Sequence, residues 1–188
     1  FDVSLPGFTV AALKTLSGFG SVTGDVSVAP TGIVAPGTNS APGTLTFTSS
    51  LTQSRGAVTD FDLSANPSGP NNDLVIIQGD LNVSNGGGQN TLDISGGGAP
   101  GSVHPLFKYS GTFNGDLSYF TVVGPTGVLT NDTTSSPKVI ALIVSASVRG
   151  PTNVVWVGNP GQNDWDVLNL TNWLNSGTLD FFVSGDNV

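Results

Sequence analysis

The stretch GTLTFTSSLTQSRGAVTDFDLSANPSGPNNDLVIIQGDLNVS (residues 43–84) decides the fold of this chain. Residues 44–48 (TLTFT) and residues 57–64 (AVTDFDLS) each alternate apolar and polar side chains with a period of two. This period is typical of β-strands that bury one face. Thr, Val and Phe are enriched in both segments, and Gly, Asn, Pro and Ser bound them, which favours strands over helices.

The same arrangement recurs along the chain, from residue 22 to residue 81, at intervals of 25 and then 30 residues. Repeats of 20 to 50 residues indicate a stacked architecture, in which each unit is too small to bury its own apolar face. We therefore expect an all-β chain, namely a right-handed parallel β-solenoid. A β-sandwich is the alternative, because short strands and turn spacing do not distinguish the two folds. Three pairs of apolar residues carry the repeat, each with a spacing of four across a polar or Gly-containing corner: Val22 and Val26, Phe47 and Leu51, and Ile77 and Leu81.

Residues 18–95 resemble the autotransporter-associated β-strand repeat, also called the passenger-associated transport repeat. The resemblance lies in turn and core positions, so it implies a β-helix fold and an extracellular setting and brings no catalytic residue. The matching positions are Pro36, Gly37, Gly43, Leu45, Phe61, Leu63, Asp73, Leu74, Ile76, Gly79 and Leu81.

Composition narrows the possible functions. The chain of 188 residues has 26 Gly and 12 Pro, but 37% hydrophobic and only 10% charged residues, which argues against a disordered coil. A net charge of −8 makes nucleic acid and anionic membrane surfaces unlikely partners, since both require a basic patch. No cysteine is present to form a disulfide, and no apolar run reaches the roughly 18 residues that would predict membrane insertion. Because the chain begins at Phe1, we expect a processed or excised piece.

Further strands are predicted beyond the central stretch. Residues 138–145 (KVIALIVS) contain an unbroken apolar run, so we expect a strand buried on both faces, or one whose outer face is covered by a loop or a partner. Residues 10–16 are too short for an independent helix and are expected to form a strand or one helical turn. Short strands are also expected at residues 91–94, 103–109, 120–123 and 128–130.

The C-terminal part differs in character, so we divide the chain into solenoid repeats over residues 1–153 and a Trp-rich terminal segment over residues 154–188. This segment resembles the one that often opens a new unit in long proteins of the same repeat family, where Phe-Asp commonly follows. Phe1-Asp2 resembles that continuation, which predicts one period of a longer array or a subunit whose ends meet. The residues that carry the resemblance are Trp156, Trp165, Asn172, Trp173, Gly185, Asp186 and Val188.

Candidate chemistry is sparse. His104 is the single histidine and has no nucleophile-elbow motif beside it, so we interpret it as a structural or surface residue. Asp60 and Asp62 are expected on one face of a strand, with Phe61 and Leu63 on the other. With Asp73 and Asp80 from adjacent repeats they form a candidate calcium site of a polysaccharide-cleaving β-helix, for which Arg55 is the nearby basic residue. The simpler interpretation is a solvated outer face.

Two further sites are candidates in the Trp-rich segment. Asp164 and Asp166 form a weak match to a calcium loop, because the full series of ligands and the distal Glu are missing. Trp165 and Trp173 are candidates for stacking on glycan rings. No cofactor and no catalytic residue is predicted.

The sequence therefore predicts a structural, non-enzymatic repeat unit of an extracellular bacterial surface protein or filament that assembles head to tail. The alternatives are a glycan-binding or surface-binding adhesin and a polysaccharide-cleaving β-helix. The partner is expected to be a further copy or a tandem repeat, because open strand edges pair with other strands unless they are capped. The expected assembly interface consists of Phe1, Phe8, Val154, Trp156, Trp165, Trp173, Phe181 and Phe182.

Overall fold

The computed structural model describes residues 7–38, 41–84, 89–98, 100–145, 153–158, 173–180 and 187–188. The chain divides into two compact units, Phe1–Ser145 and Ala146–Val188. The first unit ends at residue 145, whereas the sequence predicted a boundary after residue 153.

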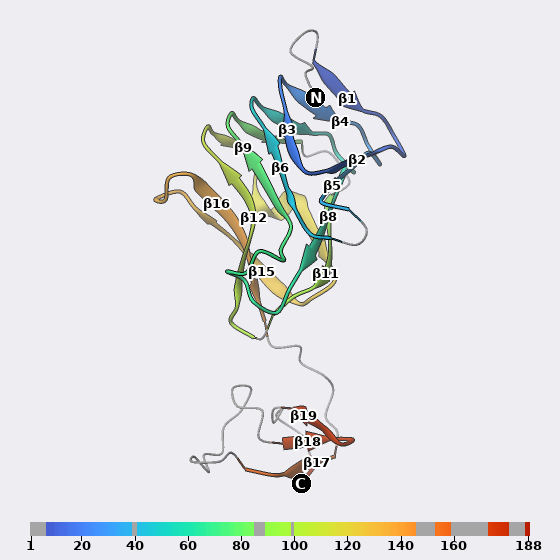
Figure 1. The fold of residues 1–188 in the computed structure, drawn as a ribbon, viewed down its shortest axis with the longest axis vertical. Helices are drawn as coiled ribbons and strands as arrows, with labels where there is room; N and C mark the ends of the chain where they lie inside the picture. The colour runs from blue at the N-terminus through green and yellow to red at the C-terminus, as the bar shows by residue number, and fades with distance from the viewer. Residues whose placement is uncertain are drawn as a thin grey trace. The chain divides into compact units, whose positions relative to one another are not determined.

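The first unit consists of β-strands in three sheets, with one short 3-10 helix, η1 (Leu117–Tyr119), among its described residues (Figure 1). Sheet 1 contains β1 (Phe8–Val10), β4 (Val26–Val28), β7 (Leu51–Gln53), β10 (Leu81–Val83) and β13 (Phe113–Asn114). Sheet 2 contains β2 (Thr15–Gly18), β5 (Ile33–Pro36), β8 (Val58–Leu63), β11 (Asn90–Gly96) and β14 (Phe120–Val123). Sheet 3 contains β3 (Gly20–Val22), β6 (Thr44–Phe47), β9 (Leu74–Ile77), β12 (Val103–Tyr109), β16 (Lys138–Val144) and β15 (Gly127–Asp132).

Every strand from β1 to β11 pairs in parallel with the strand three places later in the chain. We call three consecutive strands, one in each sheet, a repeat. Corresponding members of the three predicted apolar pairs are register partners. The first members form one ladder, in which Val22 pairs with Phe47 and Phe47 pairs with Ile77. The second ladder runs Val26, Leu51, Leu81 in the same way. All six side chains are buried, so the predicted repeat intervals are confirmed. A β-sandwich is built from antiparallel sheets and does not fit this pairing.

The end of sheet 3 departs from the parallel pattern. β16 pairs antiparallel with β12, and β15 pairs antiparallel with β16. The predicted strand at residues 138–145 is therefore confirmed, but the expectation that it continues a parallel stack is wrong. Its inward side chains, such as Ile140 and Leu142, are buried, whereas Val139 and Ile143 on the outer side are half-buried, so burial on both faces is only partial. This hairpin gives sheet 3 six strands, one more than either neighbouring sheet.

The three sheets enclose one hydrophobic core that draws on every repeat. Valines dominate the first repeats, and aromatic rings fill the core near the C-terminal end of the stack. The ring centroids of Phe61 and Phe107 lie 5.4 Å apart with an edge-to-face geometry, and those of Phe107 and Phe120 lie 6.0 Å apart. Such aromatic pairs stabilise a core beyond the area that they bury.

The corner between sheet 3 and sheet 1 carries a ladder of side-chain acceptors. The carboxylate of Asp25 accepts the backbone N–H of Ser50 at 3.1 Å, and the hydroxyl of Ser50 accepts the backbone N–H of Asp80 at 3.2 Å. Asp80 in turn accepts the backbone N–H of Thr112 at 2.7 Å. Gly79 is required here, because a Cβ at this position would lie 2.8 Å from the backbone of Ser50. Each repeat thus holds the backbone of the next one at this corner.

The second unit contains an antiparallel sheet of β17 (Val154–Trp156), β18 (Trp173–Asn175) and β19 (Thr178–Asp180). Ser176 and Gly177 connect β18 to β19 with positive φ angles of 51° and 85°, as a two-residue type I′ hairpin requires. The rings of Trp156 and Trp173 pack edge to face with centroids 4.9 Å apart.

Truncation of one ladder side chain should destabilise the first unit. Leu51 is fully buried between Val26 and Leu81, so Leu51→Ala is expected to lower the free energy of unfolding by about 2 to 5 kcal/mol. Ser27→Ala, at an exposed position of the adjacent strand, should change it by less than about 0.5 kcal/mol. Chemical denaturation of both variants measures the difference, and equal effects would contradict the stacked core.

Candidate functional site

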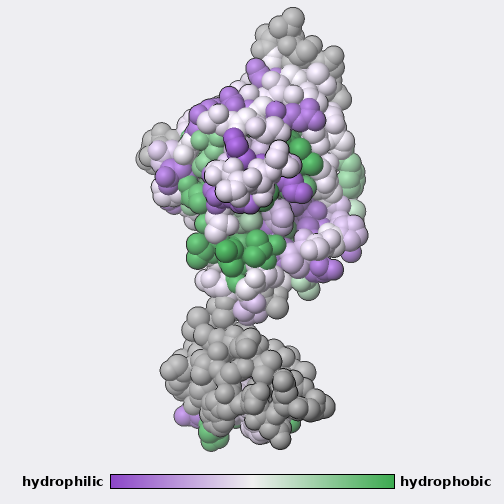
Figure 2. Space-filling model, turned by 90° about the vertical axis from the view of Figure 1, so that its left-hand side faces the viewer, coloured by the Kyte–Doolittle hydropathy of each residue, from purple (hydrophilic) through white to green (hydrophobic). Residues whose placement is uncertain are grey.

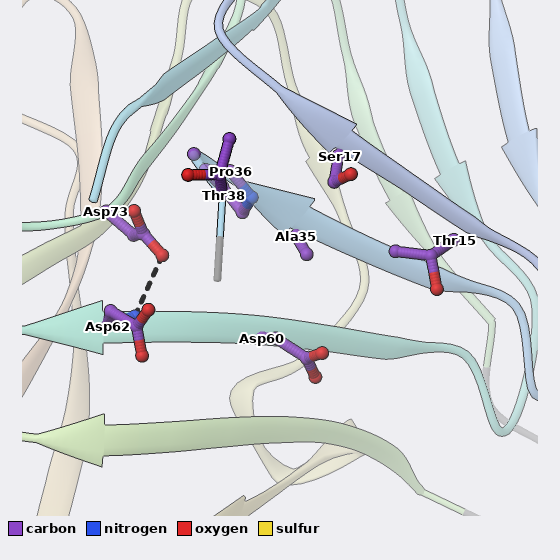
Figure 3. A pocket seen from close by; sticks show the side chains of 9 residues that line it. Thr15, Ser17, Ala35, Pro36, Thr38, Asp60, Asp62 and Asp73 are labelled. Atoms are coloured by element: carbon purple, nitrogen blue, oxygen red, sulfur yellow. Dashed lines mark hydrogen bonds between the residues drawn. The ribbon is translucent and has the colours of Figure 1, made fainter. Parts of the chain in front are cut away.

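A polar groove of about 360 Å³ lies on the outer face of sheet 2 (Figure 3). Asp60 and Asp62 project into it from β8, and Thr15 and Ser17 flank it from β2. The remaining lining residues are Ala35, Pro36, Gly37, Thr38 and Asp73.

The alternation of β8 directs its carboxylates into this groove. Phe61 and Leu63 point inward and are buried, whereas Asp60 and Asp62 lie on the outer face, as the sequence predicted. The neighbouring strand β11 adds a further carboxylate, because Asp93 is the register partner of Asp60. Ser95, the partner of Asp62, donates a hydrogen bond to it. The outer face of sheet 2 therefore concentrates negative charge and hydroxyl groups.

Asp73 joins the groove from a different part of the chain. Its side chain is only 2% exposed. One carboxylate oxygen accepts the backbone N–H of Gly43 at 2.6 Å, and the other accepts the backbone N–H of Asp62 at 2.8 Å. The backbone N–H of Asp73 also donates to the carbonyl of Asp62 at 2.9 Å. Asp73 thus ties the end of β8 to the start of β6, which gives it a structural role.

Two carboxyl groups of the groove are harder to ionise than ordinary aspartates. Burial raises the pKa of Asp60, and the carboxylates of Asp93 and Asp62 raise it further. Burial also raises the pKa of Asp73, although the two backbone N–H donors partly oppose this effect by stabilising its charged form. Repulsion between close carboxylates is consequently built into this face of sheet 2.

The candidate calcium and lyase chemistry is not assembled here. Asp80 lies in the corner between sheet 3 and sheet 1, where it accepts the N–H of Thr112, so the prediction that it joins Asp60 and Asp62 is wrong. Arg55 lies in the turn between β7 and β8 and is not among the groove residues. Within the described ranges, no group of three carboxylate or histidine side chains is placed to hold a metal ion.

His104 is a buried residue of β12 rather than a surface residue. Its ring is fully enclosed, with Nε2 at 3.1 Å from the hydroxyl oxygen of Ser102, while Nδ1 has no hydrogen-bond partner among the residues that the structure describes. Burial lowers its pKa below the ordinary value of 6.5. A catalytic histidine would need an orienting acceptor at Nδ1, so this geometry supports the structural interpretation.

The residues predicted for assembly, for glycan stacking and for the calcium loop of the Trp-rich segment fall into three groups. Phe8 is a half-buried residue of the first strand of sheet 1. In the second unit Val154 and Trp173 are buried and Trp156 is half-buried. Trp173 is completely covered and packs on Trp156, so it exposes no ring face in this structure, while glycan stacking by this residue and by Trp165 stays a prediction. The others lie outside the described residues: Phe1, Asp164, Trp165, Asp166, Phe181 and Phe182.

Sequence reasoning missed Asp93, Ser95, Thr15 and Ser17. Thr15 and Ser17 line the groove because β2 pairs with β5. Asp93 and Ser95 lie next to Asp60 and Asp62 because β11 pairs with β8, and they line a separate hollow rather than the groove. The predicted intervals of 25 and 30 residues do not align Asp93 with Asp60, which lies 33 residues earlier. The available signal was the alternation of residues 91–94, which places Asp93 between Leu92 and Ile94 as Asp60 lies between Thr59 and Phe61.

Comparison of the chain with protein-family models, with curated proteins and with solved structures found no match. Among the described residues, no helix is long and apolar enough to cross a membrane.

Removal of one groove charge should stabilise the fold at neutral pH. The raised pKa means that the folded state binds a proton at Asp60 more readily than the unfolded state, so stability falls as pH rises above 3.8. Asp60→Asn is therefore expected to raise the free energy of unfolding at pH 7 by on the order of 0.5 kcal/mol and to leave it nearly unchanged at pH 3.

The matched control for this prediction is Asp25→Asn, which should have the opposite effect at pH 7. The hydroxyl of Ser49 and, to a smaller extent, the backbone N–H of Ser50 donate hydrogen bonds that lower the pKa of Asp25, so its ionised form stabilises the fold. Thermal unfolding of both variants at the two pH values provides the test. A loss of stability in Asp60→Asn at pH 7 would show that its carboxylate is not under repulsion.

Proposed function

We propose that this chain is a structural, non-enzymatic unit of an extracellular bacterial surface protein or filament, in which residues 7–145 form a right-handed parallel β-solenoid. The observation that carries the proposal is the parallel register of β1 to β14 in three sheets around one core, with only the hairpin of β15 and β16 departing from it. In such a stack each repeat contacts the repeats before and after it, and the stack is itself the functional part. Handedness follows the general rule that crossover connections between parallel strands are right-handed.

The extracellular setting rests on the resemblance of residues 18–95 to autotransporter passenger repeats. The fold is held by stacked apolar ladders and Asp-containing corners, and the chain has no cysteine, which fits an extracellular and a cytosolic protein equally. The function proposed is to form an extended and rigid body, with no chemistry required of the groove on sheet 2.

The ends of the stack support association of copies head to tail. β14, the last strand of sheet 2, runs parallel to β11, so it has the direction that a following repeat would need. β15 recovers the same direction in sheet 3, since it is reversed twice relative to β12. Because the hairpin adds one strand to sheet 3, a second copy approaching this end meets β15 before it meets β13 or β14. The joint therefore forms first at β15.

An apolar patch next to β15 strengthens this choice of contact. Val103, Ile143 and Val128 are register partners across three strands; Val103 is 47% exposed and Val128 is 61% exposed. Figure 2 faces the side of the molecule that carries β12 and β16 and displays apolar residues gathered on it. An apolar surface beside an edge strand favours contact with another protein surface.

A charge on the edge strand should weaken association. Val128→Lys places an ammonium group on the outer face of β15, where lysine protects natural edge strands from pairing. We expect the concentration needed for half-maximal assembly to rise at least about tenfold, as a loss of 1.4 kcal/mol per joint would produce. Sedimentation velocity and electron microscopy of the intact chain measure this.

The matched control is Thr46→Lys on β6, which carries the same charge on the outer face of an interior strand of the same sheet. It should assemble like the parent chain. If the parent chain remains monomeric at every concentration, the proposed assembly is refuted. Equal weakening by both variants would place the joint elsewhere than at β15.

A further inference from the structure

His104 sits where the hairpin of β15 and β16 joins the stack. It pairs with Leu142 of β16 across the sheet, next to the pair formed by Val103 and Ile143. Its ring meets Ser102, and the carbonyl of Ser102 accepts the backbone N–H of Val144 at 2.9 Å. His104 is therefore linked to the last residue of β16 through a single intermediate residue.

The ring of His104 is closely packed, and the side chains described next to it are uncharged. A Cβ at Gly98 would lie 2.9 Å from Nε2 and 3.0 Å from the carbonyl oxygen of Ala65, so the loop packs closely over the ring. Leu142, Gly98, Ala65 and Ser102 carry no charge. Burial alone lowers the pKa of His104, with no charged group contributing.

The charged groups of the two paired strands lie at their other end. Lys108 pairs with Val139, and Lys138 pairs with Tyr109, four or more residues away from His104 along the ladder. At about 3.3 Å per residue this is a separation of roughly 13 Å. The other end is also pinned by polar contacts, because the hydroxyl of Tyr109 donates to Asn131 at 2.7 Å and Lys138 donates to the carbonyl of Gly111 at 2.6 Å.

We propose that His104 is an acid-sensitive latch that holds the β15–β16 hairpin on the end of sheet 3. In neutral imidazole one nitrogen contacts Ser102, and Nδ1 is left without a partner in the core. In imidazolium both nitrogens carry protons, so Nδ1–H becomes a buried charged donor without an acceptor. This form is relieved when the ring reaches water. We place the opening between the Val103 end of β12 and β16, because the backbone link from Val144 to Ser102 and the pairing of His104 with Leu142 lie there.

The direction of the effect follows from linkage. The opened hairpin exposes the ring and binds the proton with an ordinary pKa near 6.5, whereas the closed hairpin binds it less readily. The closed state is therefore fully favoured above pH 6.5 and loses stability as pH falls below it. At pH 5.5 the opening equilibrium should be more favourable than at pH 7.5, by up to about tenfold, the limit reached when the closed state binds no proton. Opening should concentrate at residues 127–129 and 142–144, because contacts of Tyr109 and Lys138 hold the other end.

Hydrogen exchange followed by mass spectrometry tests the latch in the intact chain. After correction for intrinsic exchange rates, we expect protection of residues 142–144 to fall between pH 7.5 and pH 5.5, by up to about tenfold. Protection of β7, in the middle of sheet 1, should stay constant. In His104→Gln, whose amide does not titrate, the pH dependence at residues 142–144 should disappear.

Nuclear magnetic resonance gives a readout that needs no variant, because the chain has a single histidine whose imidazole signal is unambiguous. We expect its titration midpoint below 6.5, and opening of β16 to follow the same titration. If His104→Gln fails to fold, the agreement between the imidazole titration and the opening of β16 is the deciding test of the latch. Protection of residues 142–144 that does not change with pH would overturn the latch. The same would follow if protection of these residues fell equally in His104→Gln, or if the imidazole titrated at 6.5 or above.

Discussion

Hydrogen bonding between successive repeats, in a fixed register, is the constraint on which the rest of this structure depends. A single repeat contributes three strands of two to seven residues, which cannot bury an apolar face alone. Stacking places Leu51 between Val26 and Leu81, and Phe47 between Val22 and Ile77, so these inward side chains are covered by their counterparts in the neighbouring repeats. A slip of one residue in the strand pairing would turn these apolar side chains toward solvent. The register and the core therefore stabilise each other.

The same register also determines the surface. Corner residues repeat at the interval of the core residues, which lets Asp25 and Asp80 hold the backbone of the following repeat. On sheet 2 the register brings Asp60 and Asp93 together, and the resulting repulsion is a cost that the fold tolerates. This groove is therefore explained as a by-product of stacking, and the proposed contact with a second copy is made at the ends of the stack instead.

Much of this fold follows from the sequence, because alternation with period two reports which face of a strand is buried. The spacing of four between Phe47 and Leu51 also predicted the corners and the pairing between repeats. The same spacing placed Asp80 in a corner between Ile77 and Leu81, so the sequence already contained the signal that Asp80 faces away from the groove. What could not be predicted is the direction of residues 138–144. An unbroken apolar run has no alternation, and strand direction is set by the connection at residues 133–137 rather than by composition.

Parallel register between repeats is the central claim, and backbone nuclear Overhauser effects test it most directly. Parallel and antiparallel strands bring different backbone protons together, so the two pairings give distinct patterns. In the isotopically labelled chain we expect contacts in the parallel pattern that link Ser27 to Thr52 and Thr52 to Asn82. Antiparallel contacts among these three segments, or none between them, would contradict the stacked repeats and every inference that rests on them.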